Sequence, residues 1–418
     1  MKILVLNSGS SSQKSALYEI SGALPVHPPT PLWQGKIEWN GDQADIQALN
    51  SSGAKVESRV KVASRSDAIK QLLDTLWDGK ARAVSAPSEI DVVGHRIVHG
   101  GKEFEKATVI TPRVKSAIAG MAVFAPLHNR AELDGIEIVE TRLGNVPQVA
   151  VFDTGFHSRL PESAAVYPGP YEWLAKGIRR YGFHGINHQY CAERTAQLLG
   201  RELDSLKLVT CHLGNGCSLA AITHGRSVDT TMGFTPLDGL MMGTRSGSLD
   251  PGILSYLMRE EKSTGEQLDN LLNTKSGLLG ISGRSGDMRE IVTTMNGGNA
   301  RAKLAFDMFV HHLQSGIGAM IAVLGRIDAL IFTAGIGENS PEVRAAACAN
   351  FGFLGLKLDG AKNGQSPADQ EISLPESAVR VLIVRAQEDW AIARDCWRLV
   401  GENNAASQRN TSRTAGII

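Results

Sequence analysis

The sequence predicts an α/β protein of two lobes with a cleft between them, built from a duplicated fold. The chain has 418 residues, 42% of them hydrophobic, which is enough for two domains that each bury a core. A strand, a glycine-rich polar turn and a second strand occur near the N-terminus and again around Gly214. This repeated hairpin indicates the duplication. A third glycine-rich turn differs, because it leads from a strand into a helix.

The first hairpin begins with an apolar run, residues 3–6, followed by the stretch NSGSSSQKSAL. Aligned on Lys14, the motif G-x-x-x-x-G-K-[ST] would need glycines where Ser8 and Gln13 stand, so this is not a Walker A loop. Its small residues nevertheless leave backbone N–H groups and hydroxyls free to approach phosphate, with Lys14 as a point charge. An ordinary Gly-Ser hairpin turn is the alternative, and this stretch alone favours it.

The next stretch, VVGHRIVHGG, has the alternation of a strand and places Arg96 and Val98 on one face. A guanidinium beside an isopropyl group suits a small carboxylic acid, because the fork binds the carboxylate and the apolar group contacts the alkyl end. The alternative is a surface or edge arginine. Arg245, in the glycine-flanked stretch GTRSGS, is a second candidate for binding an anion.

Two further patterns invite protease or metal interpretations that the sequence does not support. VFDTGFH contains Asp153 in an Asp-Thr-Gly triplet, but aspartic proteases need a second D-[ST]-G, which is missing. His184 and His188 have i,i+4 spacing without the glutamate of H-E-x-x-H, so the pattern does not predict zinc. His184 remains a candidate donor at the start of a helix, although a buried structural histidine is slightly favoured.

The third glycine-rich turn, TAGIGENSPEVR, should be a loop, with Ser340 and Pro341 beginning a helix. A long helix is expected over Ala300–Leu324, and residues 25–31 and 362–375 read as surface loops. The tail from Gly401 is polar and mostly aperiodic, which predicts fraying.

Composition excludes several classes of protein. Forty-three basic residues balance forty-three acidic ones, so no net field would recruit nucleic acid or an anionic membrane. The five cysteines form no C-x-x-C pair, which suits a reducing compartment. The N-terminal apolar run is too short for a signal peptide, and no window approaches the ~18 apolar residues of a membrane span. We expect a soluble, cytoplasmic protein.

Taken together, these stretches resemble the acetate kinase family, within the superfamily of acetate and sugar kinases, actin and chaperone ATPases. The resemblance runs in family order from Asn7 to about Arg394. Its signatures are VLNSGSSSQK, GHRIVHGG, APLHN, VFDTGFH, RRYGFHG, HLGNGCSLAA, SVDTTMGFTPLDGLMMGTRSG, SGLLGISG and FTAGIGENSPEVR. It implies two actin-like, ribonuclease H-like lobes, in which the first hairpin wraps the nucleotide phosphates.

The resemblance also implies roles for individual residues. Arg96 and Arg245 would clamp the acyl carboxylate and the migrating phosphoryl group. His184 would steady the transferring phosphoryl oxygens, and Asp153 would lie nearby as an orienting carboxylate. Asn7 and Glu388 would organise Mg2+, with Mn2+ as an alternative ion. The methyl pocket would comprise Val98, Leu127, Phe183 and Pro236. ATP or ADP, as substrate, would contact Ser10, Ser12, Lys14, His212, Leu213, Gly214, Asn215, Gly216, Asp287, Met288, Arg289, Gly335, Ile336, Gly337, Glu338 and Asn339.

The implied reaction is reversible phosphoryl transfer from ATP to acetate, giving acetyl phosphate and ADP. A carboxylate is already a nucleophile, so positioning and charge neutralisation suffice. The alternatives are a propionate or butyrate kinase of the same family and an actin-like ATPase switch that transfers no phosphate to a metabolite. Val98 favours the smaller acid, and the two arginines argue against the switch.

The expected first lobe covers residues 1–154, joined by a helix at about 386–400, and the nucleotide-binding lobe covers 155–385. Residues 401–418 would be the frayed tail, and the family implies a homodimer. The chain departs from the usual family pattern at a few positions: Arg130 for Pro, Ile186 and Asn187 for Thr-Ser, Ser248 for an acidic residue, and Ala386 and Gln387 beside Glu388.

Overall fold

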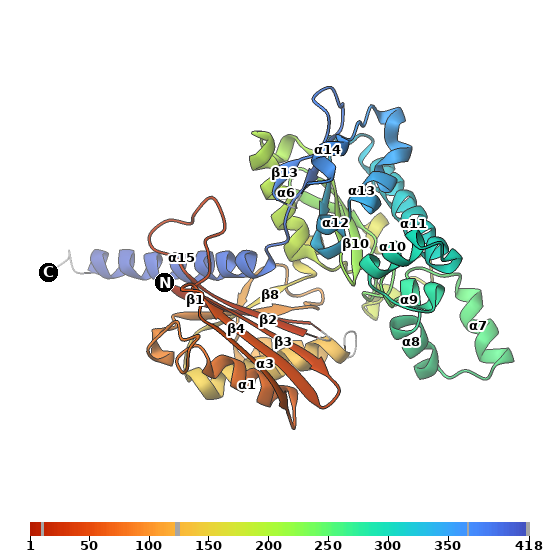
Figure 1. The fold of residues 1–418 in the computed structure, drawn as a ribbon. Helices are drawn as coiled ribbons and strands as arrows, with labels where there is room; N and C mark the ends of the chain where they lie inside the picture. The colour runs from red at the N-terminus through yellow and green to blue at the C-terminus, as the bar shows by residue number, and fades with distance from the viewer. Residues whose placement is uncertain (10–11, 122–125, 366–367, 415–418) are drawn as a thin grey trace. The chain divides into compact units, whose positions relative to one another are not determined.

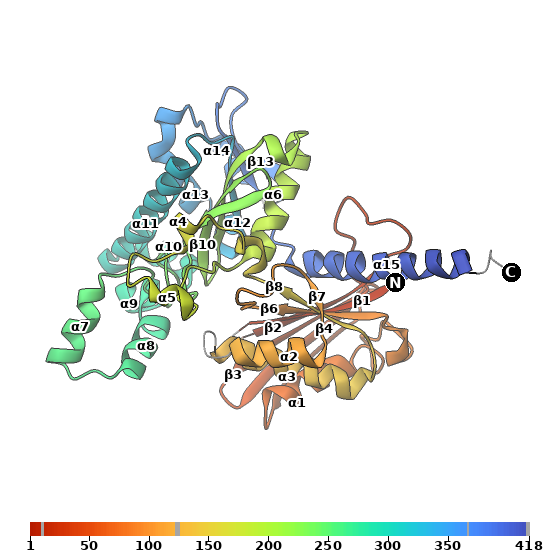
Figure 2. The ribbon, with the colours of Figure 1, turned by 180° about the vertical axis from the view of Figure 1, so that it is seen from behind.

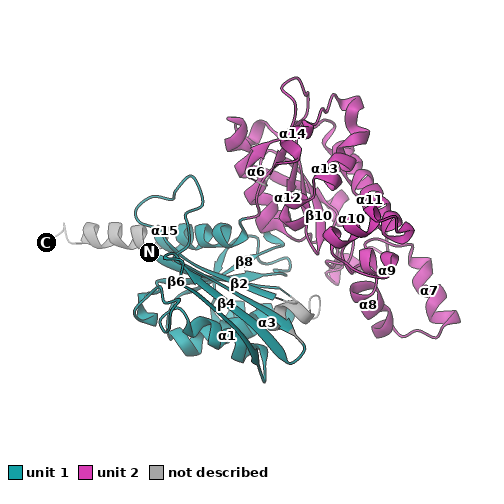
Figure 3. Ribbon diagram, viewed as in Figure 1, with its two compact units in different colours: residues 1–155, 387–418 teal, residues 156–386 magenta. Residues whose placement is uncertain are grey.

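The computed structural model describes residues 1–9, 12–121, 126–365 and 368–414. Two compact units divide the chain (Figure 3). Unit 1 comprises Met1–Gly155 together with Gln387–Ile418, and unit 2 is Phe156–Ala386. Each contains one mixed sheet with helices packed against it. The α/β class with two sheets is therefore confirmed, while the cleft expected between the lobes stays a prediction.

The sheet of unit 1 has the strand order β5-β4-β3-β2-β1-β6-β8-β7 (Figure 1). β1 pairs antiparallel with β2 and parallel with β6, and β6 is parallel to β8. β1 and β2 therefore form a hairpin, as the sequence predicts. The strands are β1 (Lys2–Ser8), β2 (Ser12–Glu19), β3 (Trp33–Asn40), β4 (Gln43–Asn50), β5 (Lys55–Lys61), β6 (Val92–Ile97), β7 (Thr108–Val109) and β8 (Gln148–Phe152).

Helices cover both faces of this sheet because β1 is apolar on both sides. Leu4 and Leu6 pack into a core with α1 (Arg65–Asp74) and α3 (Pro126–Leu143). Helix α2 (Pro112–Gly120) lies beside α3 (Figure 2). The short helix η1 (Pro87–Glu89) precedes β6.

The C-terminal helix α15 (Glu388–Thr414) returns to unit 1 and packs on β1, β2, β6 and β8. It approaches β6 so closely that a β-carbon on Gly94 would lie 2.6 Å from Cys396 Sγ and 2.7 Å from Ile392 Cγ2. Only glycine fits there without rearrangement. The helix continues past Gly401 to Thr414, whereas the sequence indicated an end near residue 400. The fraying of the tail stays a prediction.

The sheet of unit 2 has the order β11-β10-β9-β12-β14-β13. β9 is antiparallel to β10 and parallel to β12, and β12 is parallel to β14. The core β3-β2-β1-β6-β8 of unit 1 has the same order and the same directions as β11-β10-β9-β12-β14, and each sheet adds one antiparallel edge strand, β7 or β13. The duplication inferred from the two hairpins is thus present in the topology.

Two helices cover opposite faces of this second sheet. On β10, Leu219 lies against Gly316 of α11 (Ala300–Leu324), while the preceding Ser218 bonds to His188 of α6 (Gly185–Leu199). Alternate strand residues point to opposite faces, so α6 and α11 sandwich the sheet. The strands are β9 (Lys207–Leu213), β10 (Cys217–Thr223), β11 (Arg226–Thr230), β12 (Ala329–Thr333), β13 (Gln370–Glu371) and β14 (Arg380–Ile383).

Helix α11 has the bounds that the sequence predicts, because Asn299 caps its first turn through Ala302 N–H (2.9 Å) and Gly325 ends it with φ +72°. The shorter helical segments are η3 (Gly155–His157), α4 (Glu162–Ala165), α5 (Glu172–Ala175), η4 (Leu203–Ser205), α7 (Pro251–Glu260), α8 (Gly265–Thr274), α9 (Gly277–Ser282), α10 (Met288–Asn296), α12 (Ala334–Asn339), α13 (Pro341–Cys348), η5 (Ala349–Leu354) and α14 (Gly360–Asn363).

Two local expectations need correction. The third glycine-rich turn is helical, because α12 follows β12 directly, with Glu338 accepting from Ala334 N–H (2.9 Å). Ser340 still caps α13, as predicted. The region 362–375 is partly ordered into secondary structure, since it contains β13 and a bridge between Leu358 and Ser373. Among the described residues, no helix is long and apolar enough to span a membrane.

Candidate active site

The first hairpin closes tightly at the end of β1. Gly9 N–H donates to the Ser12 carbonyl (2.8 Å), and Asn7 pairs with Lys14 across the two strands. Ser12 begins β2, and the Lys14 side chain is exposed. Ser10 lies outside the described residues. The described part of this turn therefore offers small side chains and one exposed lysine, and its binding of phosphate stays a prediction.

Asn7 lies beside two carboxylates at the start of α15. Its Nδ2 donates to Glu388 Oε2 (3.1 Å) and to Asp389 Oδ1 (2.9 Å), although the residues are more than 380 positions apart. Burial raises the pKa of Asp389, with Glu388 adding to the rise and the Asn7 hydrogen bond opposing it. The two carboxylates supply oxygen donors of the kind that Mg2+ prefers. The structure as it stands directs the amide nitrogen, not the oxygen, toward the carboxylates.

Arg96 is held at the end of β6 by Asp153, which follows β8. Its Nε donates to Asp153 Oδ1 and Oδ2 (3.0 and 3.1 Å), and its Nη2 also donates to Oδ2. Nη1 reaches Asn7 Oδ1 at 3.4 Å. Burial opposes the charge, but Asp153 and Glu388 outweigh it and raise the pKa of Arg96. The guanidinium is therefore a fixed positive charge that contacts Asp153 and the amide oxygen of Asn7 and lies within electrostatic range of Glu388.

Val98 follows β6 directly, and its side chain is buried. Its backbone N–H donates to Glu132 Oε1 on α3 (3.0 Å), and the other carboxyl oxygen, Oε2, is buried without a hydrogen-bond partner among the described residues. Burial raises the pKa of Glu132 to about 8. Leu127, also expected in the methyl pocket, lies in the first turn of α3, and its side chain is outside the described part of the chain.

In unit 2, His184 is the residue before α6 and adopts left-handed backbone angles (φ +57°). Such a conformation costs about 1 kcal/mol or more for a non-glycine residue, and it is maintained only where the surroundings enforce it. The ring stacks on that of His212, with centroids 4.0 Å apart and planes inclined by 12°. His212 is the penultimate residue of β9, so the pair lies at the turn of the second hairpin.

Arg245 belongs to the same region of unit 2. A β-carbon on Gly216 would lie 3.5 Å from both Arg245 Nη1 and His184 Nε2, so both side chains line one glycine. Nη1 also donates to the Pro236 carbonyl (3.4 Å). Burial lowers the pKa of Arg245. Phe183 is fully buried, and its carbonyl accepts from His157 Nε2 (3.1 Å).

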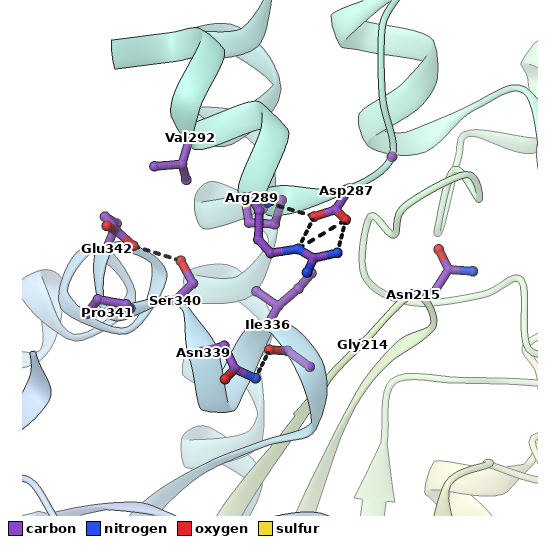
Figure 4. A pocket seen from close by; sticks show the side chains of 13 residues that line it. Gly214, Asn215, Asp287, Arg289, Val292, Ile336, Asn339, Ser340, Pro341 and Glu342 are labelled. Carbon is purple, nitrogen blue, oxygen red and sulfur yellow. Dashed lines mark hydrogen bonds and ion pairs between the residues drawn. The ribbon is translucent and has the colours of Figure 1, made fainter. Parts of the chain in front are cut away.

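A cavity of about 710 Å³ opens beside this hairpin within unit 2 (Figure 4). Asp287 and Arg289 at the start of α10 are bonded to each other on one side, and Ile336 and Asn339 of α12 lie on the other. Eight residues expected to contact the nucleotide line it: Gly214, Asn215, Asp287, Met288, Arg289, Gly335, Ile336 and Asn339. The volume suits a ligand of nucleotide size.

Five other residues of unit 2 that were expected at the nucleotide do not line this cavity: His212, Leu213, Gly216, Gly337 and Glu338. Glu338 has a different environment, because its Oε1 accepts from Ala334 N–H (2.9 Å) and Ala386 N–H (2.8 Å). It thereby connects α12 to the last residue of unit 2. The cavity is also lined by residues that were not expected at the nucleotide: Gly286, Val292, Ser340, Pro341 and Glu342.

Residues 2–394 match the model of the acetokinase family. The chain belongs to the acetokinase family. It is 58% identical over 406 residues to a protein named acetate kinase from Cyanothece sp., covering 97% of this chain and 100% of that protein. It is also 58% identical over 402 residues to one of the same name from Gloeobacter violaceus, covering 95% and 99%.

Solved structures of acetokinase relatives have the same fold. The crystal structure of Porphyromonas gingivalis acetate kinase matches with a TM-score of 0.87 at 40% identity, covering 96% of this chain and 99% of that one. A propionate kinase from Francisella tularensis matches with a TM-score of 0.85 at 36% identity, covering 94% and 98%.

The structure also adds polar contacts at the expected site residues, from residues to which the family motifs assigned no role. Asp389 contacts Asn7, Glu132 contacts Val98, and Ser218 contacts His184. Asn187, one of the positions that depart from the usual family pattern, also contacts a site residue: its Nδ2 lies 2.9 Å from His212 Nδ1. The sequence signal for Asp389 was its position next to Glu388, whereas the other three depend on contacts between distant segments.

Proposed function

We propose that the chain transfers the terminal phosphoryl group of ATP to acetate, giving acetyl phosphate and ADP, and catalyses the reverse reaction. The observation that carries this proposal is that the chain is 58% identical, over nearly its full length, to proteins named acetate kinase. The cavity beside the second hairpin supports it, because eight residues expected at the nucleotide line it.

The reaction requires charge neutralisation rather than a general base. In this proposal Arg96, fixed by Asp153, binds the carboxylate of acetate, and Arg245 neutralises the phosphoryl group. His184 donates a hydrogen bond to a phosphoryl oxygen. Val98, Leu127, Phe183 and Pro236 contact the methyl group.

A divalent cation, Mg2+ or Mn2+, would be held near Glu388 and Asp389, with Asn7 orienting these carboxylates. The ion would neutralise charge on the nucleotide phosphates. Lys14, Ser10 and Ser12 of the first hairpin would meet the phosphates. The cavity in unit 2 would hold the adenosine.

A propionate kinase is the second candidate, favoured by the similarity to the Francisella tularensis protein of that name. Purified protein incubated with ATP, Mg2+ and either acid, in the presence of hydroxylamine, should form acetyl hydroxamate more efficiently than propionyl hydroxamate. A higher kcat/KM for propionate would favour the second candidate. ADP release without any hydroxamate would instead indicate an ATPase switch.

We also propose a cytoplasmic homodimer. Helix α7 has no buried residue, and it exposes Ile253, Tyr256 and Met258 by 42%, 55% and 51%. A second copy could cover these apolar side chains. Light scattering at micromolar concentration should give twice the mass of the chain, and Tyr256→Glu should shift it toward the monomer.

A further inference from the structure

Four side chains of unit 2 form a continuous hydrogen-bonded chain behind the His184 ring. Thr210 Oγ1 lies 2.7 Å from His188 Nδ1, and Ser218 Oγ lies 2.8 Å from His188 Nε2 and 2.8 Å from His184 Nδ1. We call Thr210, His188, Ser218 and His184 the hydroxyl–imidazole chain. His184 and His188 are one helical turn apart on α6, and Ser218 lies on the neighbouring β10.

The number of available hydrogens restricts the directions of the hydrogen bonds in the hydroxyl–imidazole chain. The Ser218 hydroxyl has one hydrogen, so it donates to at most one of the two rings. Burial lowers the pKa of His188 well below its usual value, so His188 is neutral and has one N–H. The hydrogen bonds can then run from Thr210 toward His184, run in the opposite direction, or converge on Ser218, whose oxygen has two lone pairs and can accept from both rings. In the last two arrangements His184 carries its proton on Nδ1.

The stacked partner of His184 has its tautomer fixed independently. Asn187 Nδ2 can only donate, and it lies 2.9 Å from His212 Nδ1, which must therefore accept. His212 is thus a neutral ring with its proton on Nε2. That Nε2 would lie 3.7 Å from a β-carbon on Gly214, and His184 Nε2 would lie 3.5 Å from one on Gly216. Both Nε2 atoms therefore face the glycine turn of the second hairpin.

The charges nearby favour one direction. Arg245 lines the same glycine as His184, and its positive charge disfavours a second cation on the ring. A neutral ring with its proton on Nδ1 would direct a bare lone pair from Nε2 toward the turn, which would repel an anion. A neutral ring with its proton on Nε2 instead offers a donor without adding charge.

We propose that the hydroxyl–imidazole chain runs from Thr210 to His184 and holds His184 as the neutral tautomer with its proton on Nε2. In this arrangement Thr210 donates to His188 Nδ1, His188 Nε2–H donates to Ser218, and Ser218 donates to His184 Nδ1. Ser218 and His188 are positioning residues, and the group they serve is a phosphoryl oxygen. The identity of the ligand rests on the proposed function, whereas the choice of tautomer uses only the presence of an anion at the turn.

The direct test is the nitrogen NMR spectrum of the histidine rings in the resting enzyme without substrates. In protein labelled with 15N-histidine, two-bond proton–nitrogen correlations distinguish the two neutral tautomers and the imidazolium. We expect His184, His188 and His212 each to show an unprotonated Nδ1 and a protonated Nε2. A protonated Nδ1 on His184 or His188 would overturn the proposal, whatever the enzyme's activity.

The variant Ser218→Ala removes the donor to His184 Nδ1. His184 should then lose the pure Nε2–H pattern, and kcat should fall by roughly ten- to a hundredfold, as expected when one buried hydrogen bond to a reacting group is lost. KM for ATP should change little, because Ser218 does not line the nucleotide cavity.

The variant Ser227→Ala is the matched control. It removes a buried hydroxyl that bonds to His157 (2.7 Å), outside the hydroxyl–imidazole chain, and should leave the His184 tautomer unchanged. If Ser218→Ala also leaves it unchanged, the proposal is wrong. If the wild type shows the expected tautomers but forms no acyl phosphate, the proposed function fails and the hydrogen-bond order stands. The wild-type spectrum decides the question even if Ser218→Ala does not fold.

Discussion

Replacing Glu132 with glutamine should make the stability of unit 1 toward unfolding less sensitive to alkaline pH. The carboxyl group is buried, and its pKa is raised from 4.5 to about 8 mainly by burial. The folded state therefore binds this proton more tightly than the unfolded chain. Stability from the protonated group is fully present below pH 4.5 and is lost progressively as the pH rises toward 8. Glutamine keeps an acceptor for the Val98 N–H and has no charge to desolvate.

The magnitude follows from the two pKa values. Between pH 5 and pH 8, linkage at 1.36 kcal/mol per pKa unit gives a loss of about 3 kcal/mol in the free energy of unfolding of the wild type relative to Glu132→Gln. Hydrogen bonding to Val98 and the charge of Arg96 both lower the pKa of Glu132, so they are already included in this value.

Urea unfolding followed by tryptophan fluorescence suits the measurement, because five of the six tryptophans belong to unit 1. The unfolding free energies of the two proteins should be closest at pH 5 and diverge toward pH 8, with the variant the more stable at the higher pH. Glu57→Gln, at an exposed ion pair, is a control that should track the wild type. Parallel curves for wild type and Glu132→Gln would show that the buried carboxyl is ionised in the folded protein.

Three further predictions concern the reaction. Arg96→Ala and Arg245→Ala should each lower kcat by a factor of about 10²–10³, or 3–4 kcal/mol. Lysine at either position should restore activity only in part, because it lacks the planar fork of arginine. Near-normal steady-state turnover of either alanine variant would refute the role of that arginine. Glu388→Ala and Asn7→Ala should each raise the Mg2+ concentration for half-maximal activity, and the double variant should be less than additive; simple additivity in a metal titration would separate the two residues. Val98→Ala should shift the kcat/KM ratio toward propionate by at most ~1–3 kcal/mol, and an unchanged ratio in parallel assays would remove Val98 from the pocket.

The hairpins were predictable from sequence because their signals are local. Residues 3–6 form an apolar run that ends at small polar residues, and this pattern recurs around Gly214 with the same result. The start of α13 at Ser340 and Pro341 is equally local. By contrast, Ala334 and the residues after it look like a loop in sequence, yet they form α12, whose first turn is capped by Glu338, four residues after Ala334.

The polar environment of the site could be predicted only in part. The family motifs indicated Asn7, Arg96 and His184, but no pattern in the chain links Glu132 to Val98 or Ser218 to His184. These contacts depend on how helices α3 and α6 pack on their sheets. A buried partner of this kind follows from tertiary packing, and neither spacing nor composition indicates it.

The position of α15 has a consequence for how the protein is made. Unit 1 contains both ends of the chain, so a ribosome delivers residues 1–155 long before the helix that packs on Gly94. Unit 2 is one continuous segment and can be completed as soon as Ala386 emerges. A nascent chain that ends at residue 386 and has fully emerged from the ribosome should therefore contain a protease-resistant unit 2 and a protease-sensitive unit 1. Equal resistance of the two units would mean that the sheet of unit 1 folds without its C-terminal helix.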